Sequence, residues 1–478
     1  MFLGGNKFKG LTGLAAVLMM AGSICSCSIN GMESAEAAVN IYDKNKEDGR
    51  RYILVEENKN LSEAGEKAEP QSAENAEVKT EIEVKRVKPE GPLRLVRISW
   101  DPIPGAVGYQ LIITEKPEEN SSQAVFVKNG IFNTGYEIDL SSRRTMWDCY
   151  WSVCPINSRC EAIGGYTEPK PMTGDAVEWD PVSPLPTTEY DKMEYSLVYP
   201  TFSWIPVNKA HSYEIRVSKE DDSIPGKFNT LRSFRTDNNI FYENAGYTWP
   251  GKYRWQVRAW DIAGNPSTQW SSPRDFVVEK HAKVAALGDS ITHGGGVSSI
   301  PPNYTLYDWE TYCKVPVKNI GLSGDTTQGM LERFDSEVLA FSPSVLLIMG
   351  GVNNFRAGED AWETIDSMEK LRDKCTAHDI IPVFLTATPI NENLIRNVPS
   401  IGTPASNWKY EQQVLNCWIK QQRFWIDVTP RMTDKNGRLK AEMTTDGLHP
   451  DLEGKKIIGE MVSEYLLKTF PYLDLTEK

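Results

Sequence analysis

The sequence lacks three features that would each indicate a class of protein. Its one long apolar run, 11–24, is too short to span a bilayer comfortably, so no permanent transmembrane helix is expected. The 52 Lys and Arg are outnumbered by 65 Asp and Glu, and the net charge of −13 argues against a nucleic-acid partner, because phosphate binding needs clustered basic residues. There is no Cys-x-x-Cys pair and no His cluster, so no metal site is expected.

The N-terminus has the layout of an export signal. Lys7 and Lys9 precede the apolar run, which contains mainly small residues near its end. The sequence Ile24-Cys25-Ser26-Cys27 resembles a bacterial lipobox, in which Cys27 would be the lipidated residue. We interpret residues 1–27 as a lipoprotein signal peptide and expect an exported protein, lipid-anchored to a bacterial cell envelope membrane. The alternative is a cleaved secretory signal with incidental cysteines.

The next segment, residues 28–92, is predicted to be a flexible charged tether. Its part from 44 to 92 is rich in Glu, Lys, Asn and Ala, and only 52–55 is apolar. Such a composition buries too little apolar surface to offset the conformational entropy of the chain. A flexible segment of this length has an end-to-end distance of about 40–50 Å, which would hold the folded part away from a membrane surface.

The chain of 478 residues is too long for one hydrophobic core, and an internal repeat divides its middle part. Three short segments recur as similar sequences later in the chain, each at the same distance in residues. Segment 99–102 recurs at 203–206, 109–112 at 213–216, and 151–153 at 255–257. A constant offset indicates duplication. Each unit alternates apolar and polar residues in short segments, which is typical of a β-sandwich. Both units, 93–180 and 181–280, resemble the fibronectin type III sandwich. Their role as spacers or as carbohydrate-binding modules is left open.

The repeat also predicts the surroundings of three cysteines in the first unit. Cys149 aligns with the inward-facing Tyr253 and is predicted to be a core thiol. Cys154 aligns with an outward position, and Cys160 lies across the following turn. Because an exported protein meets an oxidising compartment, we predict a hairpin disulfide between Cys154 and Cys160.

From residue 281 the pattern changes to alternating strands and helices. The apolar, β-rich runs are 283–287, 315–320, 344–349, 381–387 and 424–428, and the helical stretches are 361–377, 407–422 and 451–470. This alternation predicts an α/β domain over 281–478, with a parallel sheet covered on both faces. In such sheets the ligand site lies at the carboxyl ends of the strands.

Three short motifs directly follow the first three predicted strands. The turn 288–292 presents the hydroxyl of Ser290, the glycine-containing loop 319–326 brings a backbone N–H close to a bound oxygen, and the segment 350–354 supplies the side-chain amide of Asn353. Taken alone, the first two motifs are more typical of an ordinary turn or loop, and the third also fits the capped start of a helix.

A fourth motif, 445–450, follows the last strand. Asp446 and His449 stand three residues apart, so the carboxylate can meet one ring nitrogen while the other ring nitrogen accepts a proton from a serine. A capped helix with a surface histidine is the alternative for this motif alone. Together the four motifs supply a nucleophile, a base, an orienting acid and oxyanion donors, which are the components of an acyl-transfer site.

With these four blocks in order, residues 283–470 resemble the SGNH (GDSL) hydrolase family. The resemblance implies a flavodoxin-like α/β/α fold and a serine esterase that needs no cofactor. It assigns the following roles: nucleophile Ser290, acid Asp446, base His449, oxyanion donors Ser290, Gly324 and Asn353, and supporting residues Asp289 and Asn354. One departure is visible, because the family usually has Asp where this chain has Asn354. The effect of that change on loop geometry and substrate choice is left open.

The resemblance and the export signal together lead us to expect an esterase that removes acetyl or other short acyl groups from carbohydrate at the cell envelope. A lysophospholipase or thioesterase acting on longer acyl chains is the second enzymatic interpretation. A surface binding protein with a vestigial hydrolase domain is the alternative from another class. A narrow site would favour acetyl groups, and a long apolar groove would favour lipids.

Overall fold

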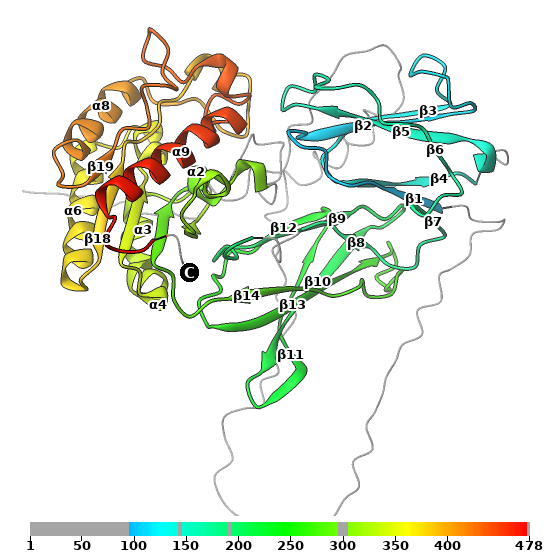
Figure 1. Cartoon of the computed structure of the whole chain (residues 1–478), viewed down its shortest axis with the longest axis horizontal. Coiled ribbons are helices and arrows are strands. Elements are labelled where there is room, and N and C mark those ends of the chain that lie inside the picture. The colour runs from blue at the N-terminus through cyan, green and yellow to red at the C-terminus, as the bar shows by residue number, and fades with distance from the viewer. Residues whose placement is uncertain (1–94, 142–145, 189–192, 295–304, 476–478) are drawn as a thin grey trace, which may run out of the picture.

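The computed structural model describes residues 95–141, 146–188, 193–294 and 305–475. The predicted signal peptide with Cys27 and the predicted tether lie outside the described residues. Figure 1 shows two β-rich units followed by an α/β domain. Within the described ranges, no helix is both long enough and apolar enough to cross a membrane.

The two β-rich units are each built from a three-stranded and a four-stranded antiparallel sheet. In the first unit, sandwich 1, the sheets have the orders β4-β1-β7 and β3-β2-β5-β6. Its strands are β1 (Leu95–Ser99), β2 (Gly108–Thr114), β3 (Phe126–Ile131), β4 (Gly135–Asp139), β5 (Tyr150–Ile156), β6 (Lys170–Pro171) and β7 (Val177–Trp179).

The second unit, sandwich 2, has sheets of the orders β12-β9-β8 and β11-β10-β13-β14. Its strands are β8 (Leu185–Pro186), β9 (Thr201–Ile205), β10 (Ser212–Asp221), β11 (Ile224–Thr236), β12 (Ile240–Tyr242), β13 (Gly251–Trp260) and β14 (Arg274–Val278).

The sequence repeat is preserved in the register of the strands. Tyr109 pairs with Pro155 in sandwich 1, and Tyr213 pairs with Ala259 in sandwich 2, at the offset that the sequence shows. In both units this tyrosine packs edge-on against a tryptophan, with ring centroids 5.3 Å and 5.1 Å apart. The two units therefore repeat the same core contacts.

The predicted disulfide between Cys154 and Cys160 is wrong. Cys154 is a free thiol, and its Sγ lies 3.4 Å from the carbonyl oxygen of Gly164. The hairpin is closed by a bridge between Ile156 and Ala162, so the residue facing Cys154 across the hairpin is Gly164, while Cys160 lies in the turn. The third cysteine, Cys149, is buried in the core of sandwich 1, as predicted.

The C-terminal domain contains a five-stranded parallel sheet of the order β16-β15-β17-β18-β19. This order, in which the second strand lies outside the first, is that of a flavodoxin-like fold, and its ligand site lies where the order reverses. The strands are β15 (Val284–Gly288), β16 (Lys318–Gly321), β17 (Val345–Met349), β18 (Ile381–Leu385) and β19 (Trp425–Ile426). They confirm the five predicted strands, with ends that differ from the predicted bounds by up to three residues.

Helices cover both faces of this sheet (Figure 1). Helix α6 contacts α3 and α8 on one face, and α9 covers the other face with the short helix η4 (Trp309–Tyr312). The α-helices are α2 (Ser290–His293), α3 (Thr327–Arg333), α4 (Leu339–Phe341), α5 (Val352–Ala357), α6 (Ala361–Ala377), α7 (Glu392–Ile395), α8 (Trp408–Ile419) and α9 (Leu452–Thr469). The predicted helices correspond to α6, α8 and α9.

The C-terminal domain also packs against both sandwiches. Val107 of sandwich 1 and Tyr307 of the C-terminal domain are buried against each other, with Phe132 and Leu452 beside them. Residues 195–199, which precede β9 of sandwich 2, share one hydrophobic core with the parallel sheet. The three units are therefore in direct contact.

The repeated tyrosine offers a test of this architecture. The hydroxyl of Tyr109 accepts a hydrogen bond from the backbone N–H of Ile103 (3.0 Å), and that of Tyr213 accepts one from Val207 (2.9 Å). Replacing either tyrosine with Phe leaves a backbone N–H unpaired, which costs about 1–3 kcal/mol. We expect the larger loss for Tyr213→Phe, because its bond is fully buried. Denaturant unfolding of the two variants measures the losses, and an unchanged free energy of unfolding for Tyr213→Phe would contradict this prediction.

Candidate active site

Ser290 lies at the point where β15 ends and α2 begins. Asp289 caps α2 by accepting a hydrogen bond from the backbone N–H of Ile291 (2.9 Å). This cap fixes the turn that carries the Ser290 hydroxyl. Ser290 is only 1% exposed, so its hydroxyl is enclosed by the surrounding loops.

The structure brings Ser290, His449 and Asp446 together in one hydrogen-bonded row. His449 Nε2 lies 2.8 Å from Ser290 Oγ, and His449 Nδ1 lies 2.8 Å from Asp446 Oδ2. The other carboxylate oxygen accepts the backbone N–H groups of Leu448 (2.8 Å) and His449 (2.9 Å). Burial raises the pKa of Asp446, but the charge of His449 and these hydrogen bonds outweigh burial and leave the pKa below its usual value.

An ionised Asp446 determines the tautomer of His449. A carboxylate can only accept, so Nδ1 carries the proton and Nε2 presents a lone pair to the Ser290 hydroxyl. The row is therefore arranged to remove a proton from Ser290. His449 is 1% exposed, so water does not separate the base from the nucleophile.

The structure describes the surroundings of the three predicted oxyanion donors. The backbone N–H groups of Ser290 and Gly324 donate to no acceptor in the described ranges, and Gly324 has a φ of +83°, which favours glycine. The Asn353 amide donates one N–H to the carbonyl oxygen of Asp325 (2.8 Å), while its oxygen faces Arg356 (3.4 Å). These contacts orient the amide and leave its second N–H available for a bound oxygen.

Arg333 joins the strand ends to the loop that carries Gly324. Its guanidinium donates to the carbonyl oxygens of Gly288 (3.0 Å), the last residue of β15, and of Ile320 (2.7 Å), the residue before the last in β16. It also forms ion pairs with Asp325 and Glu337, both at 2.7 Å. The side chain is nearly buried, so these bonds act with little screening by water.

Asn354, the position that departs from the family pattern, uses both ends of its amide. Its oxygen accepts the backbone N–H of Thr327 (3.2 Å), and its Nδ2 donates to the carboxylate of Glu359 (2.9 Å). An aspartate could accept from Thr327 but could not donate to Glu359. The amide is thus matched to Glu359 of this chain.

A buried lysine lies behind the nucleophile helix. Lys455 is fully buried on α9, and its ammonium donates to the carbonyl oxygen of Ile291. Burial lowers the pKa of Lys455 and raises the pKa values of three nearby carboxyls, Asp289 (to about 6), Asp308 and Glu310. Lys455 and these carboxyls interact electrostatically, so the lysine offsets negative charge beneath the active site.

His293, at the end of α2, is a second buried histidine beside the site. Its Nε2 lies 2.7 Å from the carbonyl oxygen of Tyr199, and its Nδ1 lies 2.8 Å from Ser323 Oγ. The carbonyl can only accept, so Nε2 carries the proton and Nδ1 accepts from the Ser323 hydroxyl. Burial lowers the pKa of His293 to about 4, so the ring is neutral at pH 7.

Sequence reasoning missed Arg333, Lys455, Arg356 and Tyr199. A signal existed for Arg333, because it stands on the same face of α3 as the buried Met330 and next to the buried Phe334. A charged residue on an apolar helix face indicates a buried partner. In the described part of the chain, no group of three or more His, Cys, Asp or Glu is arranged to hold a metal ion.

The Asn354–Glu359 contact predicts the effect of restoring the family residue. In Asn354→Asp two carboxylates would face each other at hydrogen-bond distance, and both cannot be ionised without a penalty. We expect a loss of about 2 kcal/mol in the free energy of unfolding at pH 7. The double variant Asn354→Asp/Glu359→Gln restores a donor and should recover most of the loss. Equal stability of the double and single variants would refute the pairing.

Because burial lowers the pKa of His293, we expect the protein to lose stability in acid. Its pKa is about 4 in the folded protein and 6.5 without burial, so the unfolded chain binds the proton first. The stabilising contribution of neutral His293 is complete above pH 6.5 and is lost as the pH falls towards 4, by up to about 3 kcal/mol. Unfolding of the wild type and of His293→Gln at pH 7 and pH 4.5 measures this. A wild type that loses no more stability than the variant would contradict the prediction.

Comparison with known protein families finds a match in the C-terminal domain. Residues 286–457 match the GDSL-like Lipase/Acylhydrolase family, and this range contains all four motifs. No curated protein sequence matches the chain significantly.

Among solved structures, a GDSL-like lipase from Bacteroides thetaiotaomicron is similar at 20% identity and a TM-score of 0.32, over 39% of this chain and 88% of that one. A lipase/acylhydrolase from Enterococcus faecalis is similar at 21% identity and a TM-score of 0.31, over 39% of this chain and 96% of that one. The family match and the bonded Ser290–His449–Asp446 row together make the C-terminal part a GDSL-like lipase/acylhydrolase domain, and the protein is a serine ester hydrolase.

Proposed function

We propose that the protein hydrolyses carboxylic esters through an acyl-enzyme on Ser290, and that its substrate is an acylated carbohydrate of the cell envelope. The observation that carries the chemistry is the row in which His449 bridges Ser290 and Asp446 at 2.8 Å on each side. Nucleophile, base and orienting acid are thereby in hydrogen-bond contact before substrate binds. A vestigial hydrolase domain would have no need to keep this alignment.

In the first step, Ser290 Oγ attacks the ester carbonyl carbon while its proton moves to His449 Nε2. The charge that forms on His449 is stabilised by Asp446, and the charge on the carbonyl oxygen is stabilised by the N–H groups of Ser290, Gly324 and Asn353. His449 then gives the proton to the departing alcohol, which leaves the acyl group on Ser290.

In the second step, a water molecule takes the place of the alcohol. His449 Nε2 accepts a proton from this water, whose oxygen attacks the acyl carbon. The same three N–H groups stabilise the second oxyanion. Collapse of this intermediate returns the proton from His449 to Ser290 and releases the carboxylic acid.

The enclosure of the nucleophile favours a small acyl group. Ser290 and His449 are each 1% exposed, and Asn353 is 8% exposed. A long acyl chain needs an apolar groove that leads away from the nucleophile, whereas an acetyl group needs only the space beside the three oxyanion donors. This observation supports deacetylation over the hydrolysis of lysophospholipids or long-chain thioesters.

The location and the carbohydrate part of the proposal rest on the sequence before the C-terminal domain. A lipoprotein signal, a charged tether and two sandwiches suit an enzyme that acts on a polymer outside the cell. The strand orders of the two sandwiches, each with a three-stranded and a four-stranded sheet, support their likeness to fibronectin type III domains.

Replacing the nucleophile tests the mechanism. Ser290→Ala removes the attacking oxygen, so hydrolysis of p-nitrophenyl acetate by the full chain should fall by a factor of roughly 10⁴ or more. Ser344→Ala is the matched control, because Ser344 is exposed and directly precedes β17, at the opposite end of that strand from the site. Hydrolysis by Ser290→Ala at the wild-type rate would refute the serine mechanism.

The acyl preference is tested with p-nitrophenyl esters of two to twelve carbons, alongside acetylated sugars. From the enclosure of Ser290 and His449 we expect kcat/KM to fall steeply beyond four carbons, because a longer acyl chain needs more space beside the nucleophile. Release of acetate from acetylated sugars would support the carbohydrate part of the proposal. A kcat/KM that rises with chain length would instead identify a long-chain acylhydrolase.

A further inference from the structure

Residues 195–199 of sandwich 2 lie against the edge strand of the parallel sheet. The backbone N–H of Val198 donates to the carbonyl oxygen of Asn319 in β16 (3.1 Å), and its carbonyl oxygen accepts the N–H of Tyr247 from sandwich 2 (2.9 Å). All five residues are buried. The segment therefore connects the two domains through main-chain hydrogen bonds on both of its sides.

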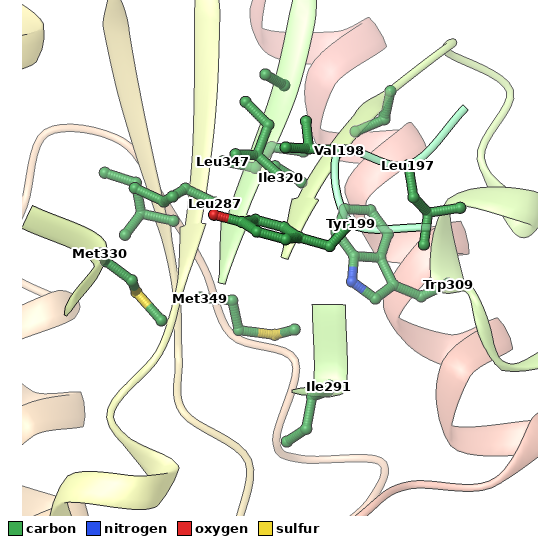
Figure 2. Close-up of a cluster of buried hydrophobic side chains, with 14 of the residues drawn as sticks. Leu197, Val198, Tyr199, Leu287, Ile291, Trp309, Ile320, Met330, Leu347 and Met349 are labelled. Atoms are coloured by element: carbon green, nitrogen blue, oxygen red, sulfur yellow. The ribbon is translucent and has the colours of Figure 1, made fainter. Parts of the chain in front are cut away.

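Tyr199 at the end of this segment enters the core of the catalytic domain. Figure 2 shows its ring among Leu287, Ile320 and Leu347, which come from β15, β16 and β17. These strands lead to the nucleophile, the Gly324 loop and Asn353. Tyr199 thus lies where the three catalytic motifs begin, although it belongs to the other domain.

The hydroxyl of Tyr199 reaches the Gly324 loop through two ionic side chains. It donates to a carboxylate oxygen of Glu337, whose other oxygen pairs with Arg333 (2.7 Å). Arg333 in turn holds Asp325, the residue after Gly324 (2.7 Å). Asp325 also accepts the Asn353 amide through its carbonyl oxygen, so two of the three oxyanion donors depend on this loop.

The carbonyl oxygen of Tyr199 reaches the same loop by a second route. It accepts His293 Nε2 from α2, the helix that begins with Ser290. His293 Nδ1 accepts from Ser323, the residue before Gly324. The hydroxyl and the carbonyl oxygen of Tyr199 therefore support the residues on either side of Gly324.

We propose that Tyr199 is a positioning residue for the nucleophile helix and the oxyanion loop, and that sandwich 2 is consequently part of the catalytic unit. This inference rests on the proposed serine-esterase function. Other contacts of the segment, such as Lys318 Nζ with the carbonyl oxygen of Ser196 (2.7 Å), dock the domains without contacting the catalytic motifs. Within the segment, Tyr199 is the residue whose side chain and carbonyl oxygen both lead to the residues flanking Gly324.

The test is Tyr199→Phe in the full chain, with Tyr213→Phe as the matched control. Both tyrosines are buried in sandwich 2 and use the hydroxyl in a hydrogen bond, but that of Tyr213 contacts Val207 and Trp204 of its own unit. The measurements are kcat and KM for p-nitrophenyl acetate, and the rate at which an aryl phosphonate labels Ser290. Unfolding curves verify that both variants are folded.

Tyr199→Phe should lower kcat and the labelling rate about tenfold with little change in KM, because misplaced oxyanion donors act on the transition state. Tyr213→Phe should keep both rates within about twofold of wild type. Equal rates in the two variants would overturn the inference and leave the serine mechanism intact, because Ser290→Ala tests that mechanism separately.

The second route is tested at Ser323, in case Tyr199→Phe does not fold. Ser323→Ala removes the hydroxyl that donates to His293, whereas Ser323→Thr keeps it. We expect kcat and the labelling rate to fall severalfold in Ser323→Ala and to be largely restored in Ser323→Thr. Wild-type rates in Ser323→Ala, or equal losses in the two variants, would overturn this route.

Discussion

The active site depends on one buried guanidinium. Arg333 donates to the last carbonyl of β15, to a carbonyl of β16 and to the carboxylates of Asp325 and Glu337. Two neighbouring strand ends and the oxyanion loop are thereby fixed to a single planar group, whose bonds have defined directions. Because removing one member of a buried ion pair costs about 3–5 kcal/mol, the loop cannot leave this position easily. The geometry around Ser290 is thus set by electrostatics as well as by the sheet.

Beneath the site, too, buried ionisable groups lie close to a group of opposite charge. Asp289, Asp308 and Glu310 all lie in the interior, and burial raises the pKa of each of them. Lys455 supplies a compensating positive charge, and its ammonium is also bonded to the carbonyl oxygen of Ile291. Asp446 differs because its hydrogen bonds and His449 keep its pKa low. Of these carboxyls, the one that must be ionised for catalysis is the one whose surroundings favour the charged form.

The sequence predicted the parallel sheet, its strands and the four motifs, because apolar periodicity and local turn chemistry are encoded within short windows. It also predicted that Ser290, Asp446 and His449 would meet, since strand ends share one edge of a sheet. The Cys154–Cys160 prediction failed because the register of one hairpin decides which residues face each other. Tyr199 was missed for a related reason. Its contacts join positions 138 residues apart, and no local pattern reports such a pairing.

The hydrogen bond between Val198 and Asn319 also bears on the order in which the domains are synthesised. β16 is an outer strand of the sheet, and an uncovered outer strand offers its backbone groups to strands of other molecules. Residues 195–199 precede β16 in the chain, so during synthesis the covering segment is available before the strand that it protects. If sandwich 2 followed the hydrolase domain instead, this outer strand would stay uncovered until sandwich 2 had been made.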